Sequence, residues 1–99
     1  MPQEASPLKA RIQDSVKDAM RAKDKDRLGT LRQITAAIKQ VEVDNRQDMS
    51  DDDIIVVLTK MTKQRKDALS QFEQAGRDDL AVIEKAELAI IEEFLPTAL

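Results

Sequence analysis

The side chains that could do chemistry in this sequence are carboxylates, lysines, arginines and hydroxyls, because the 99 residues contain no histidine and no cysteine. This excludes imidazole bases, thiol nucleophiles, disulfides and the usual zinc sites. Only two glycines are present, Gly29 and Gly76, so neither a G-x-G-x-x-G turn nor a Walker loop can be built. The composition therefore predicts no catalytic, cofactor-binding or metal-binding residues and no cofactor.

Two ionisable residues fall on the apolar faces of helical patterns. At 100° per residue, Arg65 shares a face with Ile54 and Phe72. Glu87 lies in the same way on the apolar face of the next helical segment, and a chain that folds back between the two segments brings both charges within about one helical turn. We predict a structural ion pair between Arg65 and Glu87, with Glu84 as the substitute acceptor. The alternative is that Arg65 lays its methylenes on the core and reaches water with its guanidinium.

Such a pair could also act as a general acid or base. A single carboxylate without a metal or a second base lacks the partner groups that acid–base catalysis uses, so a structural role is the favoured interpretation.

Two groups of cations could bind phosphate. One recurs at helical spacing on a polar helix face, and the other surrounds the first predicted loop. Acidic neighbours dilute both groups, the net charge is −3, and no Trp or Tyr offers a surface for stacking bases, so contacts would be to an RNA backbone. An ordinary solvated face is the alternative. The candidates for RNA-backbone contacts are Lys60, Lys63, Lys66, Lys23, Lys25 and Arg27.

Some apolar residues do not fit the expected core. Ile55 and Val56 project away from the main apolar stripe of their helix, and Leu95 and Leu99 form an apolar tail. Side chains in such positions meet another helix, a second copy of the chain or a partner protein. These four residues are the candidate partner-facing positions.

The elements that must position these side chains are helices. Apolar residues recur at spacings of three and four, and no stretch alternates as a strand does. Capping and stop signals predict four helices, which run from Ser6–Pro7 to about Lys23, from Asp24 or Asp26 to about Asn45, from a Ser50–Asp53 capping box to Gly76, and from Asp78 or Asp79 to Pro96. Met20 is expected on the core side of the first helix, and Ile83 on the core side of the last helix. The short loops predict an all-α fold, with four amphipathic helices in a small antiparallel bundle-like domain.

The distribution of charge and apolar residues bears on location and partners. Residues 1–47 carry 10 basic and 7 acidic side chains, and residues 48–99 carry 6 basic and 12 acidic ones, so the two parts differ in sign. No apolar run has the length of a signal-peptide core or a membrane span. We therefore expect a cytoplasmic protein without membrane association.

The sequence resembles the YqeY family (GatB/YqeY domain) across nearly the whole chain. The motifs that carry the resemblance are KDKDRL, the LR that follows, KQRKD, AGRDDL, and Glu87 ahead of FLP. The family is related to the tail region of the B subunit of glutamine-dependent aspartyl/glutamyl-tRNA amidotransferase. The resemblance implies that residues 1–99 are the N-terminal helical domain, and that the family's smaller C-terminal helical subdomain is absent.

What the resemblance implies about function is a non-catalytic helical module, an accessory linked to tRNA or to tRNA-dependent amidation. Its partners would be tRNA or an amidotransferase-type complex. The activity of a carbon-nitrogen ligase with glutamine as amido-nitrogen donor would belong to a separate catalytic domain that these residues do not match. Two alternatives stay open: a protein-interaction or dimerisation module without an RNA role, possible also as a homo-oligomer, and an enzyme in its own right.

Overall fold

A computed structural model describes residues 7–47 and 49–96, which form four α-helices and, within those ranges, no strand. Helix α1 spans Pro7–Ala22, α2 spans Lys25–Asn45, α3 spans Asp51–Gln74 and α4 spans Asp78–Glu92. The prediction of an all-α fold with four amphipathic helices is confirmed.

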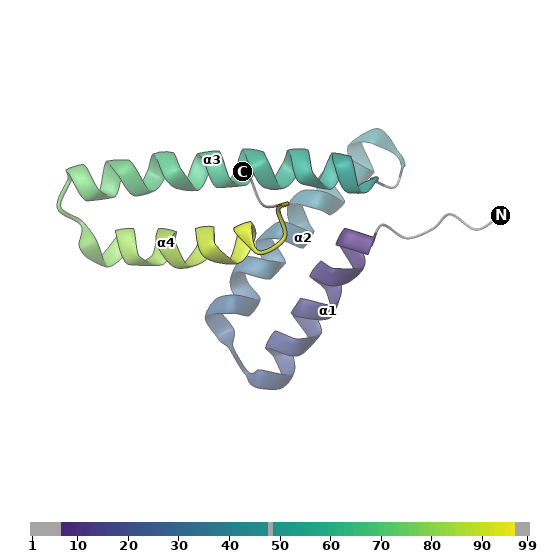
Figure 1. The fold of residues 1–99 in the computed structure, drawn as a ribbon, viewed down its shortest axis with the longest axis horizontal. Helices are drawn as coiled ribbons and strands as arrows, with labels where there is room; N and C mark the ends of the chain where they lie inside the picture. Colours follow the sequence, from purple (N-terminus) through teal and green to yellow (C-terminus); the bar gives the residue numbers. More distant parts are fainter. Residues whose placement is uncertain (1–6, 48, 97–99) are drawn as a thin grey trace.

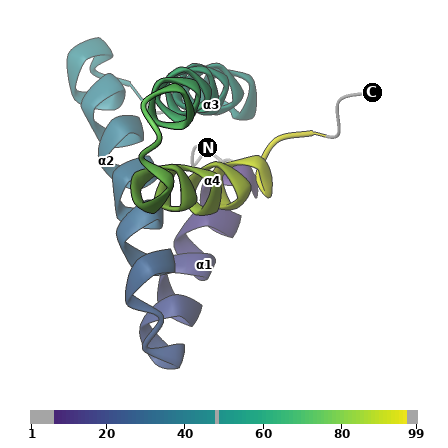
Figure 2. The same cartoon turned by 90° about the vertical axis from the view of Figure 1, so that its left-hand side faces the viewer.

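The helices pair as two antiparallel hairpins, α1 with α2 and α3 with α4, and the first hairpin crosses the second (Figures 1 and 2). Helix α2 contacts both helices of the second hairpin. The molecule is therefore elongated, with extents of 54 × 29 × 29 Å. Short loops fix the antiparallel pairing within each hairpin, and the packing of α2 fixes how the hairpins lie on one another.

Capping side chains set where two of the helices begin. The Asp24 side chain accepts a hydrogen bond of 3.1 Å from the Arg27 amide at the start of α2. At the start of α3, the Asp53 amide donates to Ser50 Oγ and the Ser50 amide donates to Asp53 Oδ2, both at 3.2 Å. This reciprocal pair is the predicted capping box, and it satisfies two amides that a helix start leaves unpaired.

The predicted cap of α4 is wrong. The helix begins one residue earlier than a cap at Asp78 requires and two earlier than a cap at Asp79 requires. Its N-cap is Arg77, whose side chain makes no capping bond. Both aspartates lie in the first turn, where the helix dipole favours negative charge without a capping geometry. Ser6, the predicted cap of α1, lies outside the described residues.

Left-handed residues end the first three helices. Gly76 has φ +72° after α3, as the sequence predicts for a glycine stop. Lys23 and Arg46 adopt φ +58° and +57° after α1 and α2, although neither is glycine. An L side chain in this region costs roughly 1–2 kcal/mol, so packing of the hairpins imposes these two conformations.

The core is built from aliphatic side chains on all four helices, together with Met49 ahead of α3 and Phe94 after α4. Met20 and Ile83 were expected there and are 52% and 53% exposed. Met20 lies near the turn of the first hairpin, which projects away from the second (Figure 1), and Ile83 lines an open groove between α2 and α4. The buried apolar residues are Leu8, Ile12, Ala19, Leu31, Ile34, Ile38, Met49, Ile54, Leu58, Ala81, Ile91 and Phe94.

Candidate functional site

Three lysines follow one another along an exposed side of α3. Lys60, Lys63 and Lys66 are solvent-exposed and have no hydrogen-bond or ion-pair partner within residues 7–47 and 49–96. They are three residues apart, so their backbone positions cover about 9 Å along the helix axis. No side chain within those ranges neutralises their charges, so this lysine row is available there to an anion.

The second cation group does not extend this row. Lys23 and Lys25 are exposed at the turn between α1 and α2. Both views place that turn and α3 on opposite sides of the molecule (Figures 1 and 2). The six predicted RNA contacts therefore do not form one continuous surface.

Arg27 is engaged by a carboxylate beyond the end of α4. Its Nη1 and Nη2 donate to Glu93 Oε2 and Oε1, both at 2.7 Å, in a bidentate pair. These bonds lower the pKa of Glu93 below its usual range and raise that of Arg27. The structure thus places Arg27 in a contact between the two hairpins, with its donors directed at the protein.

The predicted ion-pair partners lie together between the two helices of the second hairpin. Arg65 Nη1 is 3.4 Å from Glu84 Oε1 and 3.5 Å from Glu87 Oε1. The two carboxylate side chains are only 12% and 15% exposed, and that of Arg65 is 27% exposed. One guanidinium therefore serves two largely buried carboxylates, which fixes the register of α3 against α4.

A glutamine from α2 joins this cluster, and the sequence reasoning missed it. Gln33 Nε2 donates to Glu87 Oε2 at 3.1 Å, and Arg65 Nη2 donates to Gln33 Oε1. The cluster thereby connects α2, α3 and α4. Each of its two carboxylates already accepts a hydrogen bond from a protein donor, an arrangement suited to holding helices together rather than to accepting a proton from a substrate. The signal in the sequence that could have indicated Gln33 is its position directly before Ile34, which is buried.

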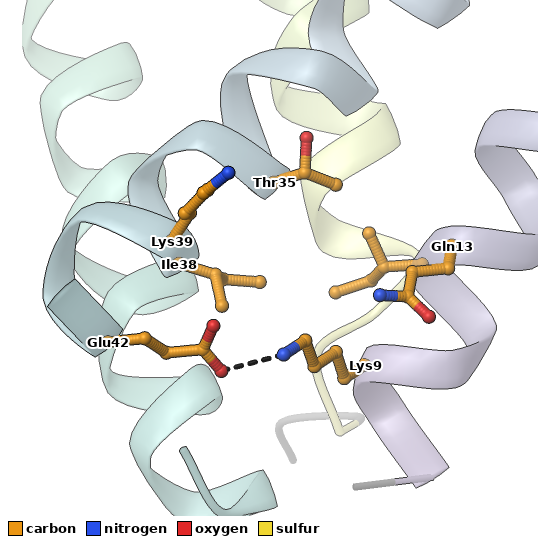
Figure 3. A pocket seen from close by; sticks show the side chains of 7 residues that line it. Lys9, Gln13, Thr35, Ile38, Lys39 and Glu42 are labelled. Carbon is orange, nitrogen blue, oxygen red and sulfur yellow. Dashed lines mark hydrogen bonds and ion pairs between the residues drawn. The ribbon is translucent and has the colours of Figure 1, made fainter. Parts of the chain in front are cut away.

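A second, partly buried ion pair lies in the groove between α1 and α2. Lys9 Nζ donates to Glu42 Oε2 at 2.7 Å across a hollow of about 300 Å³ (Figure 3). The same oxygen accepts from the Met49 amide at 3.4 Å. The bond from Lys9, and to a smaller extent that from Met49, lowers the pKa of Glu42, against the opposing effect of burial. Glu42 therefore joins α1, α2 and the segment that leads into α3.

We expect Glu42→Gln to lower the free energy of unfolding by about 1–2 kcal/mol at pH 7, because the charged acceptor is lost. The folded-state pKa of Glu42 lies below its unfolded value, so its contribution is present above the ordinary glutamate value of about 4.3 and is lost as the pH falls through the folded value. Urea unfolding at neutral and acid pH measures this. The deficit of the variant should shrink in acid.

The matched control is Glu92→Gln, at an exposed carboxylate of α4 without an ion pair in the described residues. It should follow the parent at both pH values. A Glu42→Gln deficit that is equally large in acid would contradict the role given to the ionised carboxylate.

The predicted partner-facing residues separate into two kinds. Ile55 and Leu95 are half-buried, pack against the core and line a shallow hollow together. Val56 is 62% exposed. Leu99 lies outside the described residues. The exposure of three more aliphatic residues, Val43, Val82 and Ile83, was not predicted, and the last two line the groove of about 360 Å³ between α2 and α4.

The described helices offer no metal site or membrane span. No group of three or more acidic side chains that could hold a metal ion occurs in the ranges 7–47 and 49–96. No helix there is long and apolar enough to cross a bilayer. Every buried side-chain nitrogen or oxygen in the same part of the chain has a hydrogen-bond partner, so none points to a missing ligand.

Comparison with known proteins gives consistent matches over most of the chain. The family described as Yqey-like protein matches residues 9–99. An uncharacterized protein of Schizosaccharomyces pombe is 34% identical over 89 residues, which are 90% of this chain and 72% of that protein. Proteins named "Altered inheritance of mitochondria protein 41, mitochondrial" are also similar. That of Clavispora lusitaniae is 38% identical over 89% of this chain and 51% of its own length. That of Kluyveromyces lactis is 34% identical over 90% of this chain and 50% of its own.

These relatives contradict the expected cellular location and support the expected family membership. The cytoplasmic location is contradicted, because the relatives of the second kind are named as mitochondrial. The expectation was based on the lack of a long apolar run, which argues against a secretion signal and a membrane span. It says nothing about mitochondrial import sequences, because these are amphipathic and rich in arginine and serine. This chain spans about half the length of those mitochondrial relatives. With a match over residues 9–99 and four helices in the predicted places, the chain belongs to the YqeY-like family.

Proposed function

We propose that this chain is a non-catalytic accessory module that contacts the phosphate backbone of tRNA through Lys60, Lys63 and Lys66. The observation that carries the proposal is that these three exposed lysines have no partner in the described residues, whereas Arg27 and Arg65 are held by carboxylates. Surface cations that a protein does not pair internally are the groups that displace counterions from nucleic acid. The family's relation to a tRNA amidotransferase subunit suggests tRNA-dependent amidation, or a complex that performs it, as the setting.

The size of the lysine row predicts how binding depends on salt. Three phosphate contacts give a slope of log affinity against log salt of about −2.1 to −2.7. The affinity should therefore fall roughly 20- to 40-fold between about 50 mM and 200 mM salt. The net charge of −3 keeps the interaction weak, because the rest of the surface repels the polyanion.

The test is tRNA binding at both salt concentrations by the parent chain and by Lys60→Glu/Lys63→Glu/Lys66→Glu. The variant should lose at least tenfold in affinity at low salt and most of its salt dependence. These positions are exposed, so circular dichroism should show an unchanged helical fold.

A charge-matched control separates the lysine row from net charge. Lys17→Glu/Arg32→Glu/Lys39→Glu changes the charge equally at exposed positions on α1 and α2. Equal losses in the two triple variants, or no tRNA binding by the parent chain, would overturn the proposal.

A protein-interaction or dimerisation module is the second candidate function. The exposed Val82 and Ile83, at 63% and 53%, favour it, because aliphatic side chains that line an open groove gain stability when covered. A mass that increases with concentration, together with no salt-sensitive RNA binding, would favour this candidate over the first.

A further inference from the structure

A mixed polar and apolar groove lies at one end of the lysine row, where α2 ends and α3 begins. Its volume is about 230 Å³, and Lys60 is among the residues that line it. Val56 and Val57 of α3 form part of its apolar wall, and Val56 is 62% exposed. The groove is thus continuous with the surface proposed to contact phosphate, and it offers aliphatic surface that water now covers.

Two side-chain amides line the same groove. Asn45 is the last residue of α2, and Gln47 follows the left-handed Arg46. Both are exposed, and neither amide group has a hydrogen-bond partner within the described residues. Each amide can donate and accept at once. The φ of +57° at Arg46 is strained for a residue other than glycine, and the strain lies where the two amides flank the groove.

The charge inside the groove differs from the charge at its edge. Asp53 also lines it, with one carboxylate oxygen accepting from the Ser50 amide at 3.2 Å. A carboxylate repels a phosphate and accepts from the N–H groups of a nucleobase. Lys60 supplies a single positive charge for one neighbouring phosphate. This combination suits a neutral, flat group with polar edges, attached to an anionic backbone.

We propose that this groove binds the base of an unpaired nucleotide whose phosphate lies on Lys60. The inference rests on the proposed function and narrows it, since it makes the preferred RNA one with an accessible base. The sequence predicted contacts to the RNA backbone alone, because Trp and Tyr are missing. Apolar side chains also hold extruded bases in other proteins, and here the valines would contact the face of the base. Asn45, Gln47 and Asp53 contact its edge. A fully paired duplex keeps its base edges in the helix and reaches only the lysine row.

The experiment compares two RNA hairpins of equal stem length, one with a single bulged nucleotide and one fully paired. The parent chain should bind the bulged hairpin on the order of tenfold more tightly, which is the size of about one net hydrogen bond. In Asn45→Ala/Gln47→Ala this ratio of affinities should fall to near one. The control Gln13→Ala/Gln71→Ala removes two exposed amides outside the groove and should keep the parent ratio.

The outcomes distinguish this inference from the proposed function. If both hairpins bind equally to the parent chain, and binding is still lost in the triple lysine variant, the base groove is overturned while the backbone contact stands. If the double amide variant keeps the tenfold ratio, the groove is likewise overturned. If the parent chain binds neither hairpin at low salt, the proposed function fails and this inference fails with it.

Discussion

Replacing Arg65 by methionine is expected to lower the free energy of unfolding by about 2–4 kcal/mol, which urea unfolding at neutral pH will measure. The change leaves Glu84 and Glu87, whose side chains are 12% and 15% exposed, facing the same space without a cation. Breaking a fully buried pair costs about 3–5 kcal/mol, and the residual exposure of this one lowers the figure. Methionine keeps most of the packing volume, so the decrease in the free energy of unfolding measures the effect of removing the positive charge.

A rescue experiment tests that explanation. Adding Glu84→Gln and Glu87→Gln to the Arg65→Met variant should recover much of the loss, because neutral amides tolerate a site without a cation. The matched control is Arg77→Met, which removes an arginine from an exposed pair with Asp79 and should change stability little. Equal losses in the Arg65 and Arg77 variants, or no recovery in the triple variant, would contradict the assigned role.

Phe94→Ala is expected to lower the free energy of unfolding by about 3–5 kcal/mol. Phe94 lies two residues beyond the last residue of α4, yet it is only 3% exposed and belongs to the core. The guanidinium carbon of Arg11 lies 5.4 Å from the centre of its ring, and Arg11 Nη2 donates to the Glu93 carbonyl at 3.2 Å. The aromatic ring thus attaches the end of the second hairpin to α1. Thermal or urea unfolding measures the loss.

Two further variants separate the ring's packing from its contact with the cation. Phe94→Leu should retain most of the stability, because a large apolar side chain still fills the site. Arg11→Ala should cost about 1 kcal/mol, the size of a partly exposed cation–π contact. If Phe94→Ala costs no more than Arg11→Ala, burial of the ring is not what stabilises the chain end.

Local features of this fold were predictable from the sequence. The Ser50–Asp53 box and the Gly76 stop depend on backbone geometry over a few residues, so the sequence is enough to locate them. The placement of Arg65 near Glu87 was also accessible, because two helices joined by a tight turn must run back along each other. What these predictions share is short separation along the chain.

Features that depend on how the two hairpins cross were not predictable in this way. Arg27 of the first hairpin pairs with Glu93, 66 positions away, and Gln33 of α2 donates to Glu87 of α4. Nothing in the periodicity of either helix indicates these partners. The exposure of Ile83 has the same origin, since a stripe drawn on one helix does not say whether another element covers it.

The hairpin arrangement also bears on how the chain reaches its native state. The contacts within each hairpin join segments that are adjacent in sequence, so little loop-closure entropy opposes them, and topologies of this kind fold in microseconds to milliseconds. The crossing of the hairpins is different, because the Arg27–Glu93 pair closes a loop of most of the molecule. We therefore expect each hairpin to form early, and the contacts of α1 and α2 with the second hairpin to complete the fold last. The lysine row and the Arg65–Glu87 pair belong to the hairpin expected in the early step, whereas the Gln33–Glu87 hydrogen bond between α2 and α4 belongs to the late one.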